Sequence, residues 1–528
     1  MGTLYYGDNL TILREAAKDE SVDLVYLDPP FNSNASYNVL FKAPDGHESH
    51  AQMEAFEDTW HWNETAERAF DEVMHSGNSD AAEMLRAMRS FLHDNDMMAY
   101  LAMMAVRLIE LHRVLKPTGS LYLHCDPTAS HYLKILLDAV FGKEHFKNEI
   151  IWKRSAPKGH AYSRFATTHD VIIAFHKSDS AKWNPTFAAY SEEYIKSHYS
   201  NPEPNTGRRF QLDNTLNPNP DRPNLTYEWN GHTRVWRWTK DKMQRMHDEG
   251  RLVYTRSGMP RYKRFLDEMP GTHVTDVWDD IPPINSQAQE RLGYPTQKPL
   301  TLLERIINAS SNEGDVVLDP FCGCGTTVHA AEKLKREWIG IDITHLAISL
   351  IQKRLRDAFG PIPIEIHGTP KDLGGAEALA VQDKYQFQWW AVSLVDAVPY
   401  GGKKKGADTG IDGFIYFKPD GKTTEKAIVS VKGGENVGVG MIRDLIAVVD
   451  REKAKMGVLI SLAEPTAPMK KEAVTAGFYK TEYGEYPKIQ ILTIEQLFAG
   501  DRPNMPWIDS TVFKKAKREM KGTQDKLL

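Results

Sequence analysis

The chain has 528 residues, of which 41% are hydrophobic and 26% charged, and its net charge is -6 at pH 7. This length allows about three or four domains with a large core. No apolar run approaches the length of a membrane span and the amino terminus shows no signal-peptide pattern, so we expect a cytoplasmic protein that does not enter a membrane.

The first third of the chain predicts alternating strands and helices. The predicted elements are, in order, strand 3–8, helix 10–17, strand 22–27, helix 94–115, strand 120–125, helix 129–141, and antiparallel strands 149–153 and 170–176. Residues 32–93 are polar and irregular, and we interpret them as an insertion over a site. Asp8 ends the first strand, where it is suited to cap the following helix. His169 and Asp170 open the last strand, as either a catalytic pair or a strand-end cap.

Residues 22–31, VDLVYLDPPF, end an apolar strand abruptly in two prolines. The prolines remove backbone donors at the carboxyl end of the strand, which is where open α/β sheets bind ligands. Asp28 and the carbonyl of Pro29 are suited to accept hydrogen bonds from an exocyclic amine, and Phe31 to stack on its ring. We therefore predict a catalytic, base-binding site at Asp28, Pro29, Pro30 and Phe31. An ordinary strand-to-turn transition is the alternative.

The segment 154–290 differs from its surroundings in charge and composition. Between residues 151 and 265 there are 20 Lys and Arg against 11 Asp and Glu, and aromatic residues alternate with cations in EWNGHTRVWRWTK at 228–240. Such a pattern is typical of a surface that contacts phosphates and stacks on bases. We take Arg234, Arg237 and Lys240 as DNA-binding candidates. A small β-rich domain with Trp inside and Arg outside is the alternative.

The segment 316–343 predicts a strand, a Gly-rich turn, a helix and a second strand. Gly323 and Gly325 would let the backbone approach a ligand, and Asp342 follows at the spacing of a carboxylate that binds ribose hydroxyls, although the GxGxxG pattern is absent. The chain has three cysteines, too few for a disulfide framework and without zinc-ligand spacing. Two of them, Cys322 and Cys324, lie in this turn, where their small size explains them better than redox chemistry.

DPPF at 28–31 together with DPFCGCGTT at 319–327 resembles the amino-group DNA methyltransferases, which use S-adenosylmethionine. Because DPPF comes first, the chain resembles the permuted class in which the base-binding half precedes the cofactor-binding half. The resemblance implies the cofactor-binding residues Asp8, Lys298, Asp319, Pro320, Phe321, Gly323, Gly325, Thr326 and Asp342. Asp8 would lie near the cofactor adenine, with a helix cap as its alternative. Lys298 in TQKP would meet the cofactor carboxylate, with a solvent-exposed lysine as its alternative.

The resemblance further implies methyl transfer to a base flipped out of double-stranded DNA, in a restriction-modification or related defence system. Asp before Pro-Pro favours adenine N6, and cytosine N4 is the alternative. The competing hypothesis is a recognition subunit without catalysis. A homodimer or a separate restriction or translocase subunit is a further expectation, since no GxxxxGK[ST] loop occurs in the chain.

The carboxy-terminal third carries a second module. Its GxDxGIDG and VSVKGG segments resemble Mrr-like members of the PD-(D/E)xK nuclease superfamily, which implies Asp412 and Lys432 as nuclease residues and Asp412 as a Mg2+ ligand. Ser430 stands where the general pattern has an acidic residue, so an inactive DNA-binding or scaffolding module is the alternative.

The expected fold class is therefore α/β: a Rossmann-like methyltransferase with an inserted target-recognition domain and a carboxy-terminal α/β domain resembling restriction endonucleases. In the expected domain order, residues 1–153 form the base-binding half of the catalytic domain, 154–290 the target-recognition region and 291–359 the cofactor-binding half. Residues 360–383 are expected to form a linker, 384–500 the nuclease-related domain and 501–528 a basic tail.

Overall fold

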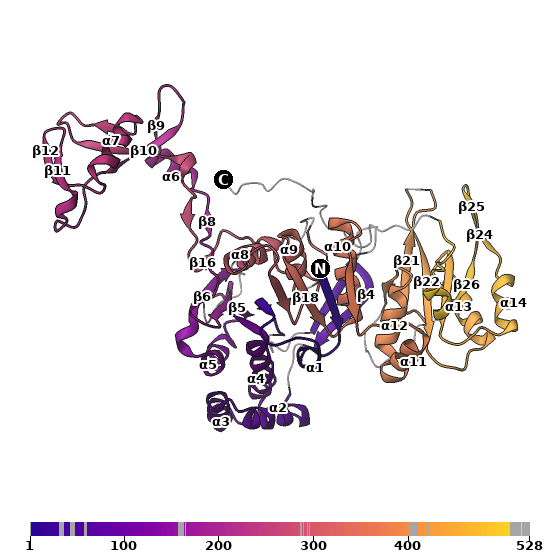
Figure 1. The fold of residues 1–528 in the computed structure, drawn as a ribbon. Coiled ribbons are helices and arrows are strands. Elements are labelled where there is room, and N and C mark those ends of the chain that lie inside the picture. Colours follow the sequence, from indigo (N-terminus) through magenta and orange to yellow (C-terminus); the bar gives the residue numbers. More distant parts are fainter. Residues whose placement is uncertain are drawn as a thin grey trace. The chain divides into compact units, whose positions relative to one another are not determined.

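The computed structural model describes residues 2–30, 36–42, 48–57, 61–156, 163, 165–285, 288, 290–292, 294, 296–400, 410–420, 422–506 and 519. The chain divides into two compact units (Figure 1). One combines Met1–Asn184 with Asp276–Lys521, and the other contains Pro185–Thr275. Within the described residues, no helix is long and apolar enough to cross a membrane.

A nine-stranded mixed sheet forms the centre of the first unit. Its strands are, in spatial order, β16 (Val277–Trp278), β6 (Phe146–Lys153), β7 (His169–His176), β5 (Leu115–Cys125), β2 (Val22–Leu27), β17 (Val316–Asp319), β18 (Glu337–Asp342), β1 (Gly2–Tyr6) and β19 (Ile364–His367). All neighbours pair in parallel except β7, which is antiparallel to β5 and β6. All six residues of β2 are buried, as a central parallel strand requires.

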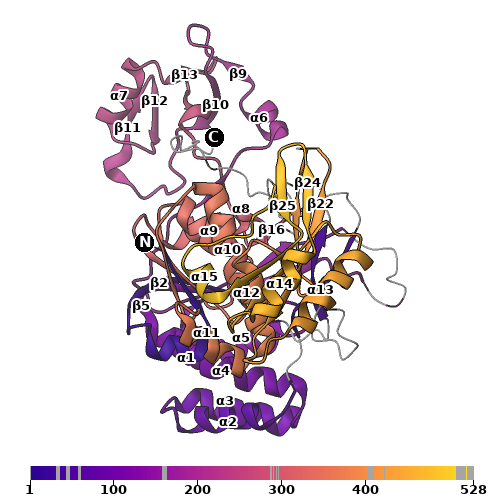
Figure 2. The same cartoon turned by 90° about the vertical axis from the view of Figure 1, so that its right-hand side faces the viewer.

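Helices cover both faces of this sheet (Figure 2). The apolar side chains of α1 (Asn9–Glu15), α4 (Asp96–Val114) and α5 (Ser130–Phe141) pack in one core with Val25 and Leu27 of β2. The opposite face carries α8 (Leu300–Ser310), where the Tyr122 hydroxyl of β5 bonds Ser310. Also present are α9 (Thr326–Lys333) and α10 (His345–Phe359). The predicted α/β fold class is confirmed.

The expectation of an irregular insertion at 32–93 is wrong for much of its length. Residues 64–92 form two helices, α2 (Glu64–His75) and α3 (Ser79–Leu92), whose Phe70, Val73 and Leu85 are buried against α4. Polar residues outnumber apolar ones in this segment, but the apolar residues recur at helical spacing, and this is why the segment forms helices instead of irregular structure. An antiparallel pair, β3 (Ser36–Lys42) and β4 (Glu48–Glu57), precedes these helices.

The second unit is small and rich in strands. Its four-stranded sheet contains β9 (Asn201–Pro202), β10 (Arg209–Asn214), β13 (Leu252–Tyr254) and β14 (Pro260–Phe265), and a hairpin is formed by β11 (Thr226–Trp229) and β12 (His232–Val235). The unit also contains α6 (Glu192–His198), α7 (Lys240–Asp248), and the pair β8 (Phe187–Ala188) and β15 (Thr272–His273). Trp229 and Trp236 form its core with Met243, Met246 and Leu252. Part of the alternating aromatic pattern therefore fills this core.

The segment 360–383, expected as a linker, contains regular structure. β19 extends the main sheet in parallel with β1, and α11 (Leu373–Gln382) packs on α12 (Lys384–Ser393). β19 is the edge strand of the sheet and pairs on one side only, with β1.

A second sheet follows, in the order β20 (Val398–Pro399), β21 (Gly413–Phe417), β22 (Glu425–Lys432), β23 (Met456–Ser461) and β26 (Ile489–Thr493). Its two faces belong to separate cores, one shared with α12 and α15 (Ile494–Phe498), the other with α13 (Val439–Arg451) and α14 (Ala467–Thr475). A hairpin of β24 (Phe478–Thr481) and β25 (Gly484–Pro487) lies between α14 and β26 in the chain.

Candidate active site

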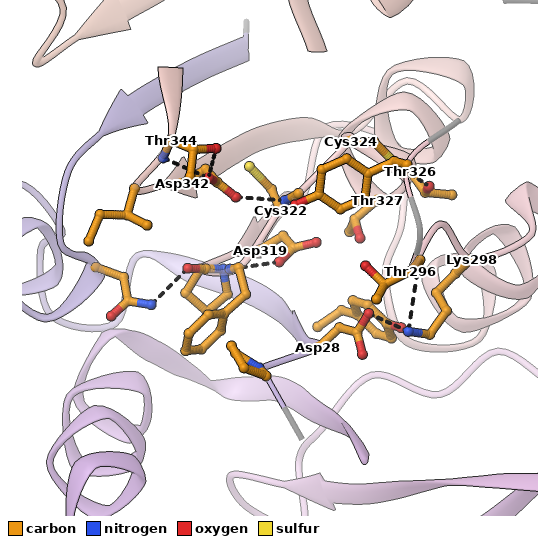
Figure 3. Close-up of a pocket in the computed structure, with 18 of the residues that line it drawn as sticks. Asp28, Thr296, Lys298, Asp319, Cys322, Cys324, Thr326, Thr327, Asp342 and Thr344 are labelled. Carbon is orange, nitrogen blue, oxygen red and sulfur yellow. Dashed lines mark hydrogen bonds and ion pairs between the residues drawn. The ribbon is translucent and has the colours of Figure 1, made fainter. Parts of the chain in front are cut away.

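A cavity of about 250 Å³ lies at the carboxyl ends of β1, β2, β17 and β18 (Figure 3). Parallel pairing brings these four strand ends to one edge of the sheet, so residues far apart in the sequence meet there. Asp28 follows β2, while Asp319 and Asp342 end β17 and β18. Three carboxylates from three strands therefore line one cavity.

Asp28 and Pro30 line this cavity, and Pro29 is buried beside them. Lys298 Nζ donates to Asp28 Oδ2 over 2.5 Å, so the carboxylate at the end of β2 is paired with the segment preceding α8. Phe31, the last predicted catalytic residue, lies outside the described residues.

The Gly-rich turn after β17 has the backbone that its glycines allow. Gly323 and Gly325 have φ of 49° and 75°, the left-handed region that disfavours other residues. A Cβ at Gly325 would also lie 2.6 Å from a side-chain atom of Ile351 on α10. Gly325 itself does not line the cavity, but it begins α9 and permits this helix to pack closely on its neighbour.

Asp342 is tied to the turn by hydrogen bonds. Its Oδ2 accepts from Gly323 N at 2.9 Å, and its Oδ1 accepts from the backbone N and the hydroxyl of Thr344, each at 2.9 Å. A carboxylate accepts about four hydrogen bonds, which leaves capacity for a ligand hydroxyl. Burial raises the pKa of Asp342 to about 6. Burial likewise raises the pKa of Asp319 to about 7, although Thr327 and the Phe321 N–H oppose this effect.

Arg107 was not predicted as a site residue, yet it lines the cavity from α4. It is buried and donates to Asp8 Oδ2 at 2.9 Å, to Asn9 Oδ1 at 2.7 Å and to the carbonyl oxygen of Met103 at 2.9 Å. Asp8 also accepts from Thr11 N at 3.2 Å, so it caps α1 as well as lining the cavity. Arg107 is the one charged residue between Met98 and Leu108, and this was the signal available in the sequence.

The predicted cofactor residues come together in the structure. Every one of them except Gly325 lines the cavity. Sequence reasoning missed Tyr26, Tyr294, Thr296 and Thr327, which also line it. Tyr26 alternates with Asp28 along β2 and so faces the same side of the sheet, a signal that the strand period contained.

A chain of buried hydrogen bonds leads away from the cavity through Tyr26. The Tyr26 hydroxyl lies 2.9 Å from His124 Nδ1, and His124 Nε2 lies 3.2 Å from Asp170 Oδ2. Burial alone would raise the pKa of Asp170, but its bond with His124 and the charges of Lys298 and Arg154 bring that pKa below its ordinary value. An ionised Asp170 accepts from Nε2, so in the neutral imidazole Nδ1 accepts from the tyrosine.

In the second unit, Arg234, Arg237 and Lys240 are all exposed. Arg237 lies 3.5 Å from Asp213 and donates to the Leu216 carbonyl oxygen, whereas Arg234 donates to the Thr233 carbonyl oxygen and Lys240 begins α7. Some of the other cations of this unit are paired with carboxylates.

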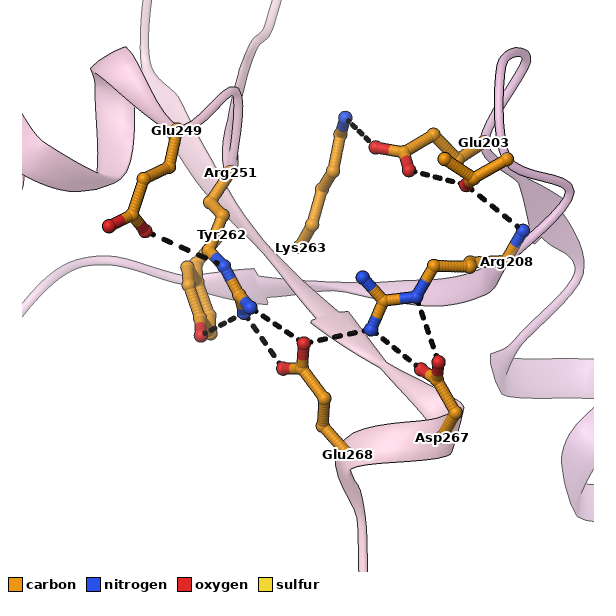
Figure 4. Close-up of polar contacts among 9 residues, drawn as sticks. Glu203, Arg208, Glu249, Arg251, Tyr262, Lys263, Asp267 and Glu268 are labelled. Atoms are coloured by element: carbon orange, nitrogen blue, oxygen red, sulfur yellow. Dashed lines mark hydrogen bonds and ion pairs between the residues drawn. The ribbon is translucent and has the colours of Figure 1, made fainter.

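Figure 4 shows Arg208, Arg251 and Lys263 with the carboxylates that they contact. Arg208 bonds both Asp267 and Glu268, Arg251 bonds the same Glu268, and Lys263 Nζ lies 2.9 Å from Glu203. Paired cations have less charge to offer phosphates, so Arg208, Arg251 and Lys263 are weaker candidates for DNA contact than Arg234 and Lys240.

In the carboxy-terminal sheet, Asp412 precedes β21 and Lys432 ends β22. The register Gly413↔Val429 places Asp412 opposite Ser430, with Lys432 two residues further on the same face. Asp412 Oδ2 accepts from Val431 N at 2.6 Å and lies 3.5 Å from Ser430 Oγ. Across the described stretches of the chain, no group of three or more His, Cys, Asp or Glu is arranged to hold a metal ion.

The fold and the cavity define a Rossmann-like α/β protein with a cavity at the carboxyl edge of its central sheet. The family described as "DNA methylase" matches residues 22–353, more than half of the sequence, and the chain belongs to this family. Residues 392–499 match a second family, described as "NACHT-associated inactive Restriction Endonuclease 1". The expected resemblance to DNA methyltransferases is thus confirmed at the level of the family.

Three relatives illustrate the likeness. The Type II methyltransferase M.EcaI of Enterobacter cloacae is 33% identical over 270 residues, which cover 50% of this chain and 59% of that protein. The Mod subunit of the Type III enzyme StyLTI of Salmonella typhimurium is 26% identical, over 63% of this chain and 50% of that protein. The DNA adenine methyltransferase YhdJ of Escherichia coli is 25% identical, over 67% and 82%. The chain therefore spans about half to three-fifths of the first two relatives.

Proposed function

We propose that the protein transfers a methyl group from S-adenosylmethionine to the N6 amine of adenine in double-stranded DNA. The observation that carries this proposal is the meeting of Asp28 with the Gly-rich turn and Asp342 in one cavity. Methyl transfer from a nucleoside cofactor to a base requires a hydrogen-bond acceptor for the amine of the base close to a turn that binds the nucleoside. Both lie at one edge of this sheet.

The residues of the cavity fit the cofactor. Asp342 retains acceptor capacity for ribose hydroxyls. Gly323 has no side chain, and a Cβ at this position would lie 3.2 Å from the Tyr294 ring, so glycine leaves room for a ligand between the turn and this ring. Lys298 and Arg107 are cations at the cavity wall. When bound, S-adenosylmethionine supplies a methyl group on a positively charged sulfur.

On the base side, Asp28 and the Pro29 carbonyl accept the two amine N–H groups, which directs the nitrogen lone pair toward the methyl donor. A base in duplex DNA must leave the stack to reach these atoms. The preference for adenine over cytosine N4 is supported by Asp at the first DPPF position and by the name of the E. coli relative, a DNA adenine methyltransferase. We assign phosphate contact to the second unit, through Arg234, Arg237 and Lys240. The chain would act within a restriction-modification system, as the name of the Salmonella relative suggests.

The test is methyl transfer by the purified full-length chain from labelled S-adenosylmethionine to unmethylated genomic DNA, followed by nucleoside mass spectrometry. We expect N6-methyladenine. N4-methylcytosine would reassign the base, and cofactor and DNA binding without product would indicate a recognition subunit.

Asp28→Ala should abolish product without weakening cofactor binding, because Asp28 is assigned to the base. Asp126→Ala is the matched control. Asp126 follows β5 as Asp28 follows β2, caps the next turn through Ala129 N and does not line the cavity. Wild-type turnover by Asp28→Ala would remove the base site from the end of β2.

For the carboxy-terminal module we propose a DNA-holding or partner-binding role on an Mrr-like fold. The support is Ser430 at the acidic position and the use of Asp412 Oδ2 by a backbone N–H. The description of the matched family as an inactive restriction endonuclease points the same way. The competing hypothesis is a nuclease in which Asp412 binds Mg2+ and Lys432 stabilises the phosphorane. The register of β21 and β22 allows both side chains to face one phosphate.

A further inference from the structure

Two residues that sequence reasoning assigns to different ligands are bonded to each other. Lys298 Nζ donates to Asp28 Oδ2 over 2.5 Å and to the Thr296 carbonyl oxygen over 3.4 Å (Figure 3). The side chains of Lys298 and Asp28 are 10% and 16% exposed, so water screens the pair weakly. Asp28 follows a buried strand and Lys298 precedes Pro299, the residue that caps α8. The pair thus links two rigid elements across the cavity.

This contact limits what Asp28 can do for a base. One of its oxygens is held by an ammonium group, and a charge-assisted hydrogen bond is about twice as strong as one from a neutral donor. The amine of a base is neutral. It therefore does not displace Lys298 from Oδ2, and although Oδ1 can still accept, the ammonium group draws charge from the whole carboxylate, so Asp28 is a weaker acceptor for the base while the pair exists.

The cavity offers few cations for a carboxylate-bearing ligand. Its lining contains four carboxylates, from Asp8, Asp28, Asp319 and Asp342, but only two cations among the described residues, Lys298 and Arg107. The Nε and both Nη atoms of Arg107 already donate to protein oxygens. A ligand carboxylate entering this acidic cavity is repelled unless it meets a cation, and Lys298 is the cation that can change partners.

We propose that Lys298 is a positioning residue that moves from Asp28 to the carboxylate of the bound cofactor and so frees Asp28 for the amine of the target base. This inference rests on the proposed function and adds an order to it, in which cofactor binding opens the base site. Lys298 keeps its proton throughout, and no bond other than hydrogen bonds changes. Because coupling between two ligands is reciprocal, the base should also tighten cofactor binding by the same factor.

The experiment uses a duplex that contains the methylation site, identified by sequencing DNA that the enzyme has methylated. 2-Aminopurine stands beside the target adenine, and its fluorescence rises when that adenine leaves the stack. The full-length chain is titrated alone, with S-adenosylhomocysteine, or with methylthioadenosine, which has the nucleoside and thioether but no carboxylate. We expect S-adenosylhomocysteine to tighten binding of the flipped base by about tenfold and methylthioadenosine by less than about twofold.

Two controls isolate the contact with Asp28. A duplex with purine in place of the target adenine has no exocyclic amine, so its binding should not depend on the cofactor carboxylate. Lys298→Met removes the charge at similar length and should bind the flipped adenine without cofactor as tightly as the wild type does with it. Lys298→Arg should keep the coupling. Lys335→Met, at an exposed lysine paired with Glu313 outside the cavity, should behave as wild type. Thermal unfolding of each variant shows that it is folded.

Equal tightening by the two nucleosides, or a tenfold coupling retained by Lys298→Met, would overturn the exchange. A failure of the proposed function would give different results. In that case calorimetry detects no binding of S-adenosylhomocysteine to the wild type, or labelled methyl groups do not reach DNA, and the exchange is rejected with it. Cofactor binding and methyl transfer without a role of Lys298 in the coupling reject the exchange alone.

Discussion

Asp342 Oδ2 accepts a hydrogen bond from the backbone N–H of Gly323 at 2.9 Å. This bond joins the end of β18 to the turn that follows β17, and β18 also pairs with β1, which leads to Asp8. The carboxylate therefore has two tasks, since it fixes the shape of the turn and remains available to a ligand hydroxyl. A substitution at Asp342 should affect both.

Asp342→Ala is expected to weaken cofactor binding by about 1–3 kcal/mol for each lost hydrogen bond to the ligand, and to lower stability because Gly323 N and Thr344 N lose their acceptor. Equilibrium dialysis measures the affinity. Asp372→Ala is the matched control, because Asp372 caps α11 through Gly375 N and does not line the cavity. Unchanged dialysis curves for Asp342→Ala would remove this residue from the cofactor site.

Asp319 gives a prediction about pH. Burial raises its pKa from 3.8 to about 7, so the folded protein binds the proton more tightly than the unfolded chain. The resulting stabilisation is present below about pH 4 and is lost as the pH rises through 7. Asp319→Asn, which cannot ionise, should be more stable than the wild type at pH 8 by up to about 4 kcal/mol, with a smaller difference at pH 5. Denaturant unfolding at both pH values measures this, and a difference independent of pH would contradict it.

Tyr26→Phe tests the hydrogen-bond chain behind the cavity. The change removes the donor to His124 Nδ1 and leaves a buried nitrogen without this partner, which should cost about 1–3 kcal/mol of unfolding free energy. The ring stays in place, so no cavity is created. Denaturant titration of Tyr26→Phe, His124→Leu and the double variant should show strong non-additivity. If the two single effects simply add, the hydroxyl and the imidazole do not interact.

The sequence was sufficient for features that depend on local pattern. A strand before Asp28 that is apolar except for Asp23, and glycines at positive φ after Asp319, determine the ends of β2 and β17, and parallel pairing brings them together. The family resemblance supplied Asp8 and Lys298 as members of the same cavity.

Features that depend on tertiary contacts could not be predicted in this way. Lys298 was expected to face a cofactor carboxylate, yet its partner in the structure is Asp28, a contact between residues 270 positions apart. Arg107 lies on α4, where most residues are buried, and only its position opposite Asp8 identifies it as a site residue. The aromatic pattern at 228–240 suggested residues that stack on bases, but Trp236 is fully buried and fills the core of the second unit.

Salt dependence separates the basic residues of the second unit. Removing Arg234 or Lys240, which have no carboxylate within ion-pair distance in the described structure, should lower the log–log salt slope of DNA binding by about 0.9 each. Arg237→Ala should lower it less, because Asp213 already lies 3.5 Å away. Arg208→Ala is the control, because Arg208 is paired with two carboxylates. This change should mainly lower the free energy of unfolding and have a smaller effect on the salt slope. Equal slopes for the wild type and the Arg234 and Lys240 variants would place these residues on an ordinary protein surface.

The last prediction concerns cleavage by the carboxy-terminal module. A two-carboxylate Mg2+ site at Asp412 would need a second acidic ligand, and Ser430 occupies the opposite position in the register. We therefore expect the purified protein to leave unmethylated DNA intact with Mg2+ and S-adenosylmethionine present, and cells that carry Asp28→Ala to grow normally. A nuclease would give the opposite result: Asp28→Ala would be toxic because unmethylated sites are cut, and adding Asp412→Ala or Lys432→Ala would relieve the toxicity. Growth curves of the single and double variants, with Asp126→Ala as the control, distinguish the two roles.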